Sequence, residues 1–382
     1  MSLSQAEELL LNDVHSQLNA TRIHEIHYPQ SIEEVVAIVK KAKAENKVIS
    51  ISGARHAMGG QQFAEHSLHM SMNKMDDVIF FDTVKGIVRV EAGIRWPKLM
   101  DYLLSIQKDN WPQWGIIQKQ TGADELSIGG ALSANAHGRG VRFKPIIQDV
   151  VSFRIVNAEG EVLHVSREHN SELFSLVVGG YGLFGVIVTV DLKLQPRQKL
   201  KRVVEIISLD ELPDKVRERL EDGFIYGDFQ YKTDEMAKDF MRRGVLSGYK
   251  PVSNDTLIPE KQKRISQTKW RELLYLAHAN KSEAFKQYAD YYLSTHEQIY
   301  WNDTHQKSYY TKDYIEYLKA VMPSLVDSSL MITEVYVPRN TLREFVERVI
   351  KDVQQHQIDI IYGTMRLIEL DDESFLAWAK KD

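Results

Sequence analysis

Residues 50–61 read Ser50-Ile51-Ser52-Gly53-Ala54-Arg55-His56-Ala57-Met58-Gly59-Gly60-Gln61. The β-branched run that leads into this stretch predicts a strand over residues 48–52. The glycines that follow predict a loop whose backbone approaches a ligand closely or takes positive φ, and successive N–H groups in such a loop form an anion-binding concavity. A plain strand-to-helix turn accounts for one such loop equally well, so this stretch alone leaves both interpretations open.

A second glycine-rich segment favours the ligand interpretation. It reads Thr121-Gly122-Ala123-Asp124-Glu125-Leu126-Ser127-Ile128-Gly129-Gly130-Ala131-Leu132-Ser133-Ala134-Asn135-Ala136-His137-Gly138-Arg139-Gly140. Its small residues allow a cofactor to pack closely, and Ser127, Ser133 and Asn135 offer hydrogen bonds. Neither loop matches the P-loop or the G-x-G-x-x-G fingerprint. Two such loops on one domain can enclose a diphosphate, so the pair predicts a dinucleotide site with His56 as a candidate attachment point.

The sequence around the two loops has an α/β pattern. Ser31 and Glu34 form a capping box, and apolar residues at helical spacing continue that helix to about Glu45. Pro97 fits the first turn of another helix. Strands are expected over residues 87–93, 149–157 and 161–165, and in a run that ends at Leu194.

One segment, residues 175–192, is long and almost free of charge. It contains four glycines and then alternates with a period of two. That period is typical of a strand and not of a membrane-spanning helix. We therefore expect a loop followed by a strand, and no membrane span.

The composition excludes several classes of function. A net charge of −5 over 382 residues gives no field that attracts nucleic acid. The absence of cysteine excludes disulfides, thiolate metal sites and catalytic thiols. His24 and His27 have no third ligand nearby, so no metal site is expected. The first residues show no basic and apolar leader, so we expect a cytoplasmic protein.

The sequence pattern changes at Pro196 and the basic run that follows it, because longer charged helices and short strands are expected beyond this point. We expect two domains, residues 1–197 and 198–382. The expected elements of the second domain are a helix over residues 270–293, strands near residues 224–231 and 330–337, a strand that ends near Ile368 and a helix over residues 372–382.

Five motifs, taken in order, resemble the vanillyl-alcohol oxidase superfamily, whose flavin domain is of the p-cresol methylhydroxylase type. They are the Ser52–Gln61 loop, Thr121-Gly122, Ser127-Ile128-Gly129-Gly130, His137-Gly138-Arg139-Gly140 and Gly179-Gly180-Tyr181-Gly182-Leu183-Phe184-Gly185-Val186-Ile187. The similarity covers residues 22–197 and is nearest in motif to alditol, aldonolactone and decaprenylphosphoryl-ribose oxidases. It implies an α+β fold, with an FAD-binding domain of two α/β subdomains and a substrate domain with an antiparallel sheet and flanking helices.

The resemblance implies FAD as the cofactor and assigns its contacts. The first loop would hold the pyrophosphate, the second would flank the flavin, and Val186 or Ile187 would lie at the adenine end. The implied FAD-binding residues are Ser52, Gly53, Ala54, Arg55, His56, Ala57, Met58, Gly59, Gly60, Gln61, Thr121, Gly122, Ser127, Ile128, Gly129, Gly130, Ser133, Asn135, His137, Gly138, Val186 and Ile187.

Two histidines have specific assignments in these relatives. In alditol and aldonolactone oxidases the residue that matches His56 is bonded through a ring nitrogen to the 8α-methyl carbon of the flavin, which implies a covalent attachment here. The alternative is that His56 binds phosphate or packs beside the ring without a bond. His137 is a candidate catalytic residue that contacts the cofactor or the substrate, with a structural role as the alternative.

Arg366 is the second candidate catalytic residue. Its segment resembles the Glu-x-Arg strand of sugar-alcohol and aldonolactone oxidases, in which the arginine faces the flavin and steadies negative charge. Thr364 stands in place of that glutamate, so the proton-handling group is left open. The relatives carry further catalytic residues downstream of the position of Asp382, so we expect an incomplete substrate domain.

The resemblance implies FAD-dependent oxidation of a CH–OH group by hydride transfer to flavin N5. The expected substrate is a small molecule, namely a polyol, a sugar or an aldonolactone, and the electron acceptor is oxygen or another compound. Two alternatives stay open. A flavin-dependent hydroxy-acid dehydrogenase of the lactate type would favour an arginine-rich carboxylate clamp in the second domain. A flavin-binding protein without turnover would fit an incomplete substrate domain.

Overall fold

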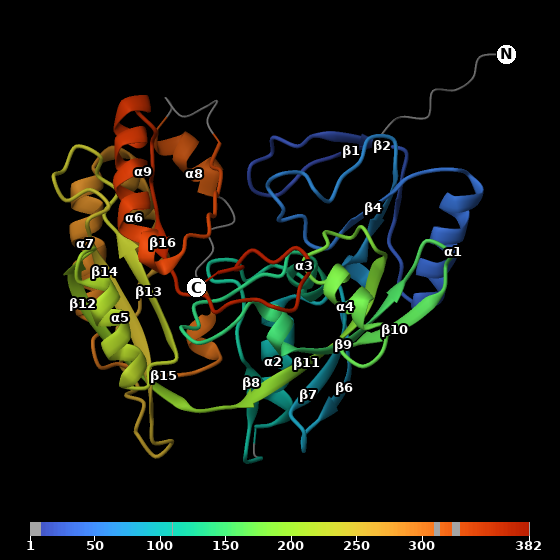
Figure 1. Ribbon diagram of the computed structural model, residues 1–382, viewed down its shortest axis with the longest axis horizontal. Helices are drawn as coiled ribbons and strands as arrows, with labels where there is room; N and C mark the ends of the chain where they lie inside the picture. The colour runs from blue at the N-terminus through green and yellow to red at the C-terminus, as the bar shows by residue number, and fades with distance from the viewer. Residues whose placement is uncertain (1–8, 109, 309–313, 323–328, 382) are drawn as a thin grey trace.

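The protein is described from a computed structural model, which covers residues 9–108, 110–308, 314–322 and 329–381. Two groups of elements lie side by side, the first built from residues up to Pro196 and the second mostly from residues after it (Figure 1). Strands β11 (Val186–Pro196) and β12 (Lys199–Ser208) carry the chain directly from the first group into the second.

A small parallel sheet begins the first group. Its strands are β3 (Glu25–His27), β5 (Leu68–Ser71) and β4 (Ile49–Ser52) in sheet order, and a separate hairpin of β1 (Leu9–Leu11) and β2 (Thr21–Ile23) precedes them. Helix α1 (Ile32–Ala44) starts at Ser31, whose hydroxyl accepts a hydrogen bond from the N–H of Glu34. The Glu34 carboxylate reaches back to the N–H of Gln30. The predicted helix and the strand before the first loop are confirmed.

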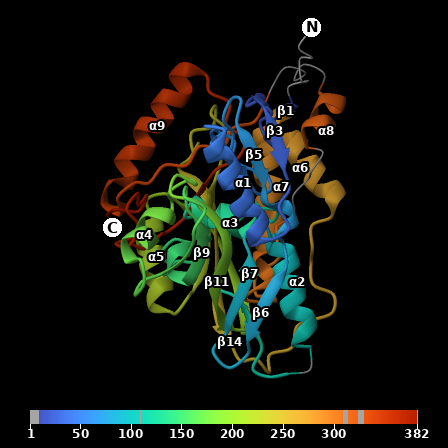
Figure 2. The same ribbon diagram turned by 90° about the vertical axis from the view of Figure 1, so that its right-hand side faces the viewer.

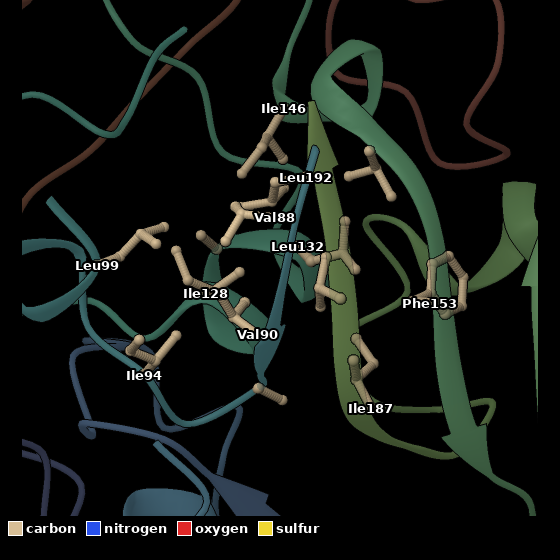
Figure 3. Packing of buried hydrophobic residues seen from close by; sticks show 14 of the residues in the cluster. Val88, Val90, Ile94, Leu99, Ile128, Leu132, Ile146, Phe153, Ile187 and Leu192 are labelled. Carbon is tan, nitrogen blue, oxygen red and sulfur yellow. The ribbon is translucent and has the colours of Figure 1, made fainter. Parts of the chain in front are cut away.

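A larger antiparallel sheet follows in the first group, and the second glycine loop packs against it. In sheet order its strands are β10 (Val162–Ser166), β9 (Val150–Val156), β11, β7 (Ile87–Glu91) and β6 (Val78–Asp82), with β8 (Trp114–Ile116) paired to the end of β11. The helical elements of this part are α2 (Trp96–Ile106), α3 (Ile128–Ser133), α4 (Ser171–Val177), η1 (Met72–Lys74) and η2 (Ile146–Asp149). Figure 3 shows Leu99 of α2 and Leu132 of α3 in one core with Val90 of β7. Burial of each such side chain contributes about 1.5–3 kcal/mol.

Strand β11 accounts for the long uncharged run. Residues Val186–Leu192 are all buried, because the strand lies between two cores. Val188 packs with α1 and the parallel sheet, whereas Ile187 and Val190 pack with α2, α3 and α4. The predicted strand is confirmed, and α4 covers the first residues of the segment. Within the described residues, every helix is too short or too polar to cross a membrane.

The second group is built on another antiparallel sheet. In sheet order its strands are β15 (Ile299–Trp301), β12, β14 (Arg243–Val252), β13 (Tyr226–Tyr231) and β16 (Thr364–Met365). Its helical elements are α5 (Leu212–Glu221), α6 (Gln267–Ala279), α7 (Lys281–Leu293), η3 (Thr304–Gln306), α8 (Tyr314–Val321), η5 (Arg339–Thr341) and α9 (Leu342–His356). One face of the sheet packs against α5 and α9, and the other packs against α7, on which α6 lies. Figure 2 shows α9 and the α6–α7 pair on opposite sides of the molecule.

A predicted helix and a predicted strand of this second group are wrong. The helix predicted over residues 270–293 is interrupted at Asn280, which has φ −157° and ψ 82° and caps the N-terminus of α7 with its side chain. Asparagine favours such positions because its short side chain satisfies a backbone N–H that the helix leaves unpaired. The strand predicted over residues 330–337 is absent, because this segment contacts the glycine loops and not a sheet edge, as Glu334 does by accepting a hydrogen bond from His137.

The helix predicted over residues 372–382 is also wrong for the part that the structure describes, residues 372–381. The Asp371 carboxylate accepts hydrogen bonds from the N–H groups of Glu373 and Ser374. Such side-chain bonds hold a turn and compete with helix formation. The strand expected to end near Ile368 is the two-residue β16, whereas the strand expected near residues 224–231 is confirmed as β13.

Two late segments return to the first group of elements. Arg197 forms an ion pair with Asp303, at 2.7 Å between Nε and Oδ2, and both side chains are buried. Near the C-terminus, Asn135 donates to the carboxylate of Asp371 at 2.8 Å, so this red segment lies against α3 (Figure 1). These contacts bring the second sheet and the glycine loops together. The division into residues 1–197 and 198–382 stays a prediction.

Candidate active site

The first glycine loop follows β4 and presents unsatisfied backbone donors. Arg55 has φ +58° and Gly60 has φ +74°. Within the described part of the chain, the structure shows no hydrogen bond from the N–H groups of Ala54 and Arg55. A left-handed residue beside unbonded N–H groups is typical of an anion-binding nest. The loop therefore fits a diphosphate.

A buried histidine that the sequence did not single out holds the start of this loop. His69 lies on β5 and is 1% exposed. Its Nδ1 and Nε2 atoms each lie 2.8 Å from a hydroxyl, that of Ser50 and that of Ser52 respectively. Burial, with a smaller effect of Arg55, lowers the pKa of His69 to about 4. The ring is therefore neutral at physiological pH, with one nitrogen as donor and the other as acceptor. The signal for this role in the sequence was a histidine placed between the apolar residues Leu68 and Met70.

The two glycine loops meet at Gly53 and Ser127. A Cβ atom on Gly53 would lie 2.0 Å from Oγ of Ser127. Ser127 is the N-cap of α3, and its hydroxyl accepts a hydrogen bond from the N–H of Gly130. Across this short helix, a Cβ on Gly129 would lie 2.8 Å from that of Ala92. The absence of side chains at these glycines is thus what allows loop, helix and sheet to lie in contact.

The second loop differs from the first because its backbone N–H groups donate to other groups of the protein. The N–H groups of Ile128 and Gly129 donate to the carbonyl groups of Ile94 and Ala92 at 2.8 Å. The N–H of Gly130 is bound by the helix N-cap. The first loop therefore supplies donors for a diphosphate, and the second supplies a closely packed wall.

The remaining predicted cofactor residues of the first loop are held by the N-terminal segment. Asn19 donates to the carbonyl of Met58 at 2.6 Å, and a Cβ on Gly60 would touch the Asn19 side chain. Ala57 accepts a hydrogen bond from the Gln62 side chain at 3.0 Å. Ser52, Gly59 and Gln61 complete the same loop.

The predicted residues outside the first loop occupy several environments. Thr121 and Gly122 lie near the second group of elements, where the N–H of Gly122 donates to Ser308. The hydrogen bonds that the structure shows for the Asn135 side chain go to protein groups, including Asp371. The carbonyl of Ser133 accepts from Tyr181, the N–H of Gly138 donates to Gln118, and the side chains of Val186 and Ile187 are buried in the two cores.

His56 lies beside a second imidazole. The ring centroids of His56 and His15 are 4.7 Å apart at an interplanar angle of 71°. Burial, with the nearby His15 as a further cause, lowers the pKa of His56 to about 4. The ring is therefore neutral at physiological pH, and a neutral ring nitrogen carries the lone pair that a bond to carbon requires.

His137 pairs with a carboxylate that the sequence did not identify. The His137 side chain is 4% exposed, and its Nδ1 lies 2.9 Å from the carbonyl of Gly138. Its Nε2 lies 2.6 Å from the carboxylate of Glu334. Burial opposes ionisation of Glu334, but the His137 bond and the charges of His137 and Arg366 lower the pKa of that carboxyl. Both ring nitrogens of His137 therefore face oxygen atoms, and the contact with Nε2 fixes the position of the Glu334 carboxylate.

The second sheet turns a polar face toward the first group of elements. Side chains alternate along a strand, so Tyr226, Asp228 and Gln230 of β13 point to one face. The hydroxyl of Tyr226 donates to the carbonyl of Ile117 at 2.7 Å, so this face meets the first group at its Tyr226 end. Farther along the same face, Val204 and Val245 pack against α7.

Seven buried atoms on or against this face have no hydrogen-bond partner among the described residues. They are Nε of Arg139, Oε1 of Gln230, Oγ of Ser247, Oη of Tyr288, Nε2 of His305, Oγ1 of Thr364 and Nε of Arg366. The strand register places Ser247 beside Asp228 and Thr364 beside Gln230. An unpartnered buried polar group costs about 1–3 kcal/mol, so this face is suited to a polar ligand.

Comparison with known proteins bears on the cofactor. Residues 24–166 match a family described as an FAD binding domain. The chain is 29% identical over 209 residues to a mitochondrial L-galactono-1,4-lactone dehydrogenase of Brassica oleracea, covering 53% of this chain and 33% of the relative. It is 29% identical over 191 residues to a D-arabinono-1,4-lactone oxidase of Candida glabrata, covering 49% and 35%. It is 28% identical over 193 residues to an L-gulonolactone oxidase of Bos taurus, covering 50% and 42%. The matched part thus spans less than half the length of each relative.

Proposed function

From a chain whose residues 24–166 form an FAD-binding domain of the vanillyl-alcohol oxidase superfamily, we infer an FAD-dependent oxidoreductase that acts on a CH–OH group. Bound FAD supplies the hydride acceptor for such a reaction. The three relatives above are named for aldonolactones, and we propose a sugar-derived substrate here, namely an aldonolactone, a sugar or a polyol.

The observation that carries this proposal is the set of unpartnered polar atoms on the face of the second sheet that bears Tyr226, Asp228 and Gln230. Gln230, Ser247 and Thr364 offer an amide oxygen and two hydroxyls, which suit a ligand with several hydroxyl groups. Arg366 offers a guanidinium group that can hold a substrate oxygen as negative charge develops on it. A face of this kind binds and orients a polyhydroxylated molecule.

The pair of His137 and Glu334 supplies a group for the hydroxyl proton. The Glu334 side chain is 46% exposed while His137 is buried, so the carboxylate is the accessible member of the pair. A carboxylate held in this way can accept a proton from a bound alcohol, and the imidazole keeps it oriented.

The test of this function is anaerobic reduction of the FAD-loaded protein. We expect at least one compound from a panel of aldonolactones, aldoses and alditols to bleach the flavin absorbance in a single turnover. If no alcohol, sugar, lactone or hydroxy acid bleaches it, the protein binds flavin without turnover and the proposal fails.

The second expected result concerns the attachment of the flavin to His56. After acid precipitation of the wild-type protein we expect a yellow pellet, because the neutral ring of His56 would bond to the 8α-methyl carbon of FAD. One hydrogen would leave each partner, and the two electrons would pass to the flavin and from it to oxygen. His56→Gln is expected to give a colourless pellet and a yellow supernatant, measured by absorbance of both fractions.

The matched control for this result is His15→Gln, which alters the neighbouring imidazole and leaves the attachment residue in place. It is expected to keep the yellow pellet. A colourless pellet from the wild-type protein would show that His56 makes no bond.

A further inference from the structure

The polar face of the second sheet holds more positive than negative charge. Arg139 and Arg202 are each 8% exposed. Neither they nor Arg366 forms an ion pair with any residue in the described part of the chain. The Arg202 guanidinium is bound by the hydroxyls of Tyr249 and Thr295. Arg139 donates one bond, from Nη2 to the carbonyl of His305 at 2.7 Å. Hydroxyl and carbonyl oxygens satisfy hydrogen bonds without neutralising the charge.

The carboxylates near these arginines are largely engaged elsewhere. Asp124 forms an ion pair with Lys119 at 2.5 Å, and Glu334 is bound to His137. Asp228 is the carboxylate that β12, β13 and β14 place on this face. Two carboxylates, Asp228 and the half-exposed Glu334, therefore face three guanidinium groups.

The pKa of Lys119 shows the effect of this positive electrostatic potential. Its side chain is fully buried and paired with Asp124. Burial lowers the pKa of Lys119, Asp124 opposes this effect, and the charges of Arg139 and Arg366 lower the pKa further. Both guanidinium groups therefore act on the same location, which is more favourable for an anion than for a second cation.

Each of the two arginines that act on Lys119 also has one N–H donor without a hydrogen-bond partner among the described residues. Nε of Arg139 and Nε of Arg366 are buried without a partner in the described structure. A carboxylate has about four acceptor positions on two oxygens, so it can accept from more than one guanidinium group. A neutral lactone carbonyl would satisfy a donor but would leave the charge uncompensated.

We propose that the substrate bound at this face carries a carboxylate, that it is an open-chain polyhydroxy acid of the aldonate class, and that Arg139 and Arg366 bind its carboxylate. Gln230, Ser247 and Thr364 then bind its hydroxyl groups. This inference rests on the proposed oxidation of a CH–OH group, and it replaces the lactone, sugar or polyol proposed above with the open-chain acid of the same carbon skeleton.

The test compares compounds that share one carbon skeleton and differ in charge. Gluconate, glucono-1,5-lactone and glucitol, and the matching galactose and arabinose series, are added anaerobically to the FAD-loaded protein, and the rate of flavin reduction is divided by the apparent Kd. We expect at least one acid to exceed its lactone and its alditol by about tenfold or more, because a hydrogen bond to a charged group contributes about 1.5–3 kcal/mol. The advantage should shrink as salt is added.

Variants assign the effect to the two arginines. Arg139→Gln and Arg366→Gln are each expected to reduce the preference for the acid over the alditol by about tenfold or more, mainly through Kd. Arg243→Gln removes an exposed charge at the start of β14 and is expected to retain the preference. FAD content and circular dichroism establish that each variant is folded. If Arg139→Gln does not fold, the Arg366→Gln variant alone provides the test.

The outcomes separate this inference from the function on which it rests. If lactones or alditols reduce the flavin as well as the acids do, the carboxylate assignment is wrong and the oxidoreductase stands. If no compound reduces the flavin, the oxidoreductase proposal fails, and binding is then measured from the shift in flavin absorbance. Gluconate, galactonate and arabinonate that bind no more tightly than their alditols would overturn the carboxylate site in that case as well.

Discussion

Gly53→Ala is expected to weaken FAD binding by about 5- to 150-fold, because overpacking costs about 1–3 kcal/mol. The new Cβ would lie 2.0 Å from Oγ and 2.8 Å from Cβ of Ser127, so the two glycine loops would have to move apart. The N–H groups of the first loop would then no longer form one concavity with the wall of the second. The measurement is the Kd of FAD from quenching of flavin fluorescence, made in the His56→Gln background so that the cofactor can be removed and added back.

A double-mutant cycle separates the steric effect from other effects of alanine. Ser127→Gly removes both atoms that the new Cβ would meet, and glycine at a helix N-cap costs only a few tenths of a kcal/mol relative to serine. We expect Gly53→Ala combined with Ser127→Gly to bind FAD as Ser127→Gly alone does. If the double variant binds as poorly as Gly53→Ala, the contact between the loops is not the cause.

Asp149→Asn is expected to stabilise the protein above neutral pH. Asp149 is 4% exposed, and neither carboxylate oxygen has a hydrogen-bond partner among the described residues. Burial raises the pKa of Asp149 from its ordinary 3.8 to about 7, and the nearby amides of Gln148 and Gln118 offset only part of this effect. The folded state therefore keeps a proton that the unfolded state releases.

The sign and the pH window follow from this difference. Below about pH 4 both states are protonated and the group has no effect on stability. Between about pH 4 and pH 7 the unfolded state binds fewer protons, so the free energy of unfolding falls by about 1.4 kcal/mol per pH unit, or about 4 kcal/mol in all. Asp149→Asn removes this contribution, so it should raise the urea midpoint at pH 8 and have little effect at pH 4.

Asp191 is the matched control for Asp149. It is also a buried aspartate of the first group, but its carboxylate is held by Arg89 at 2.7 and 2.9 Å and by Ser152. Asp191→Asn should therefore destabilise the protein, since it breaks a bidentate ion pair. We therefore expect the urea midpoint to change in opposite directions for the two substitutions. A lower urea midpoint for Asp149→Asn at pH 8 would contradict the account of its burial.

Much of the fold of the first group follows from local patterns. The box formed by Ser31 and Glu34, the alternation through β11 and the proline at the start of α2 each specify an element through residues that are adjacent in sequence. The predictions failed where a side chain redirected the backbone. Asn280 divides an apparently continuous helix, and Asp371 binds the N–H groups that a terminal helix would need.

The same division applies to the site. The sequence by itself determined the two glycine loops, since only residues with little or no side chain allow Gly53 to touch Ser127 and Gly129 to touch Ala92. It also located His56, because that histidine lies within the loop.

Only the tertiary structure decided which groups face one another across the two sheets. His137 and Glu334 are 197 residues apart in the chain, and Arg139 and Arg366 both act on Lys119 only because the second sheet returns to the second glycine loop. The physical reason is that backbone conformation depends on neighbouring residues. The charge, burial and hydrogen bonding of a side chain depend instead on the whole set of atoms that folding brings around it.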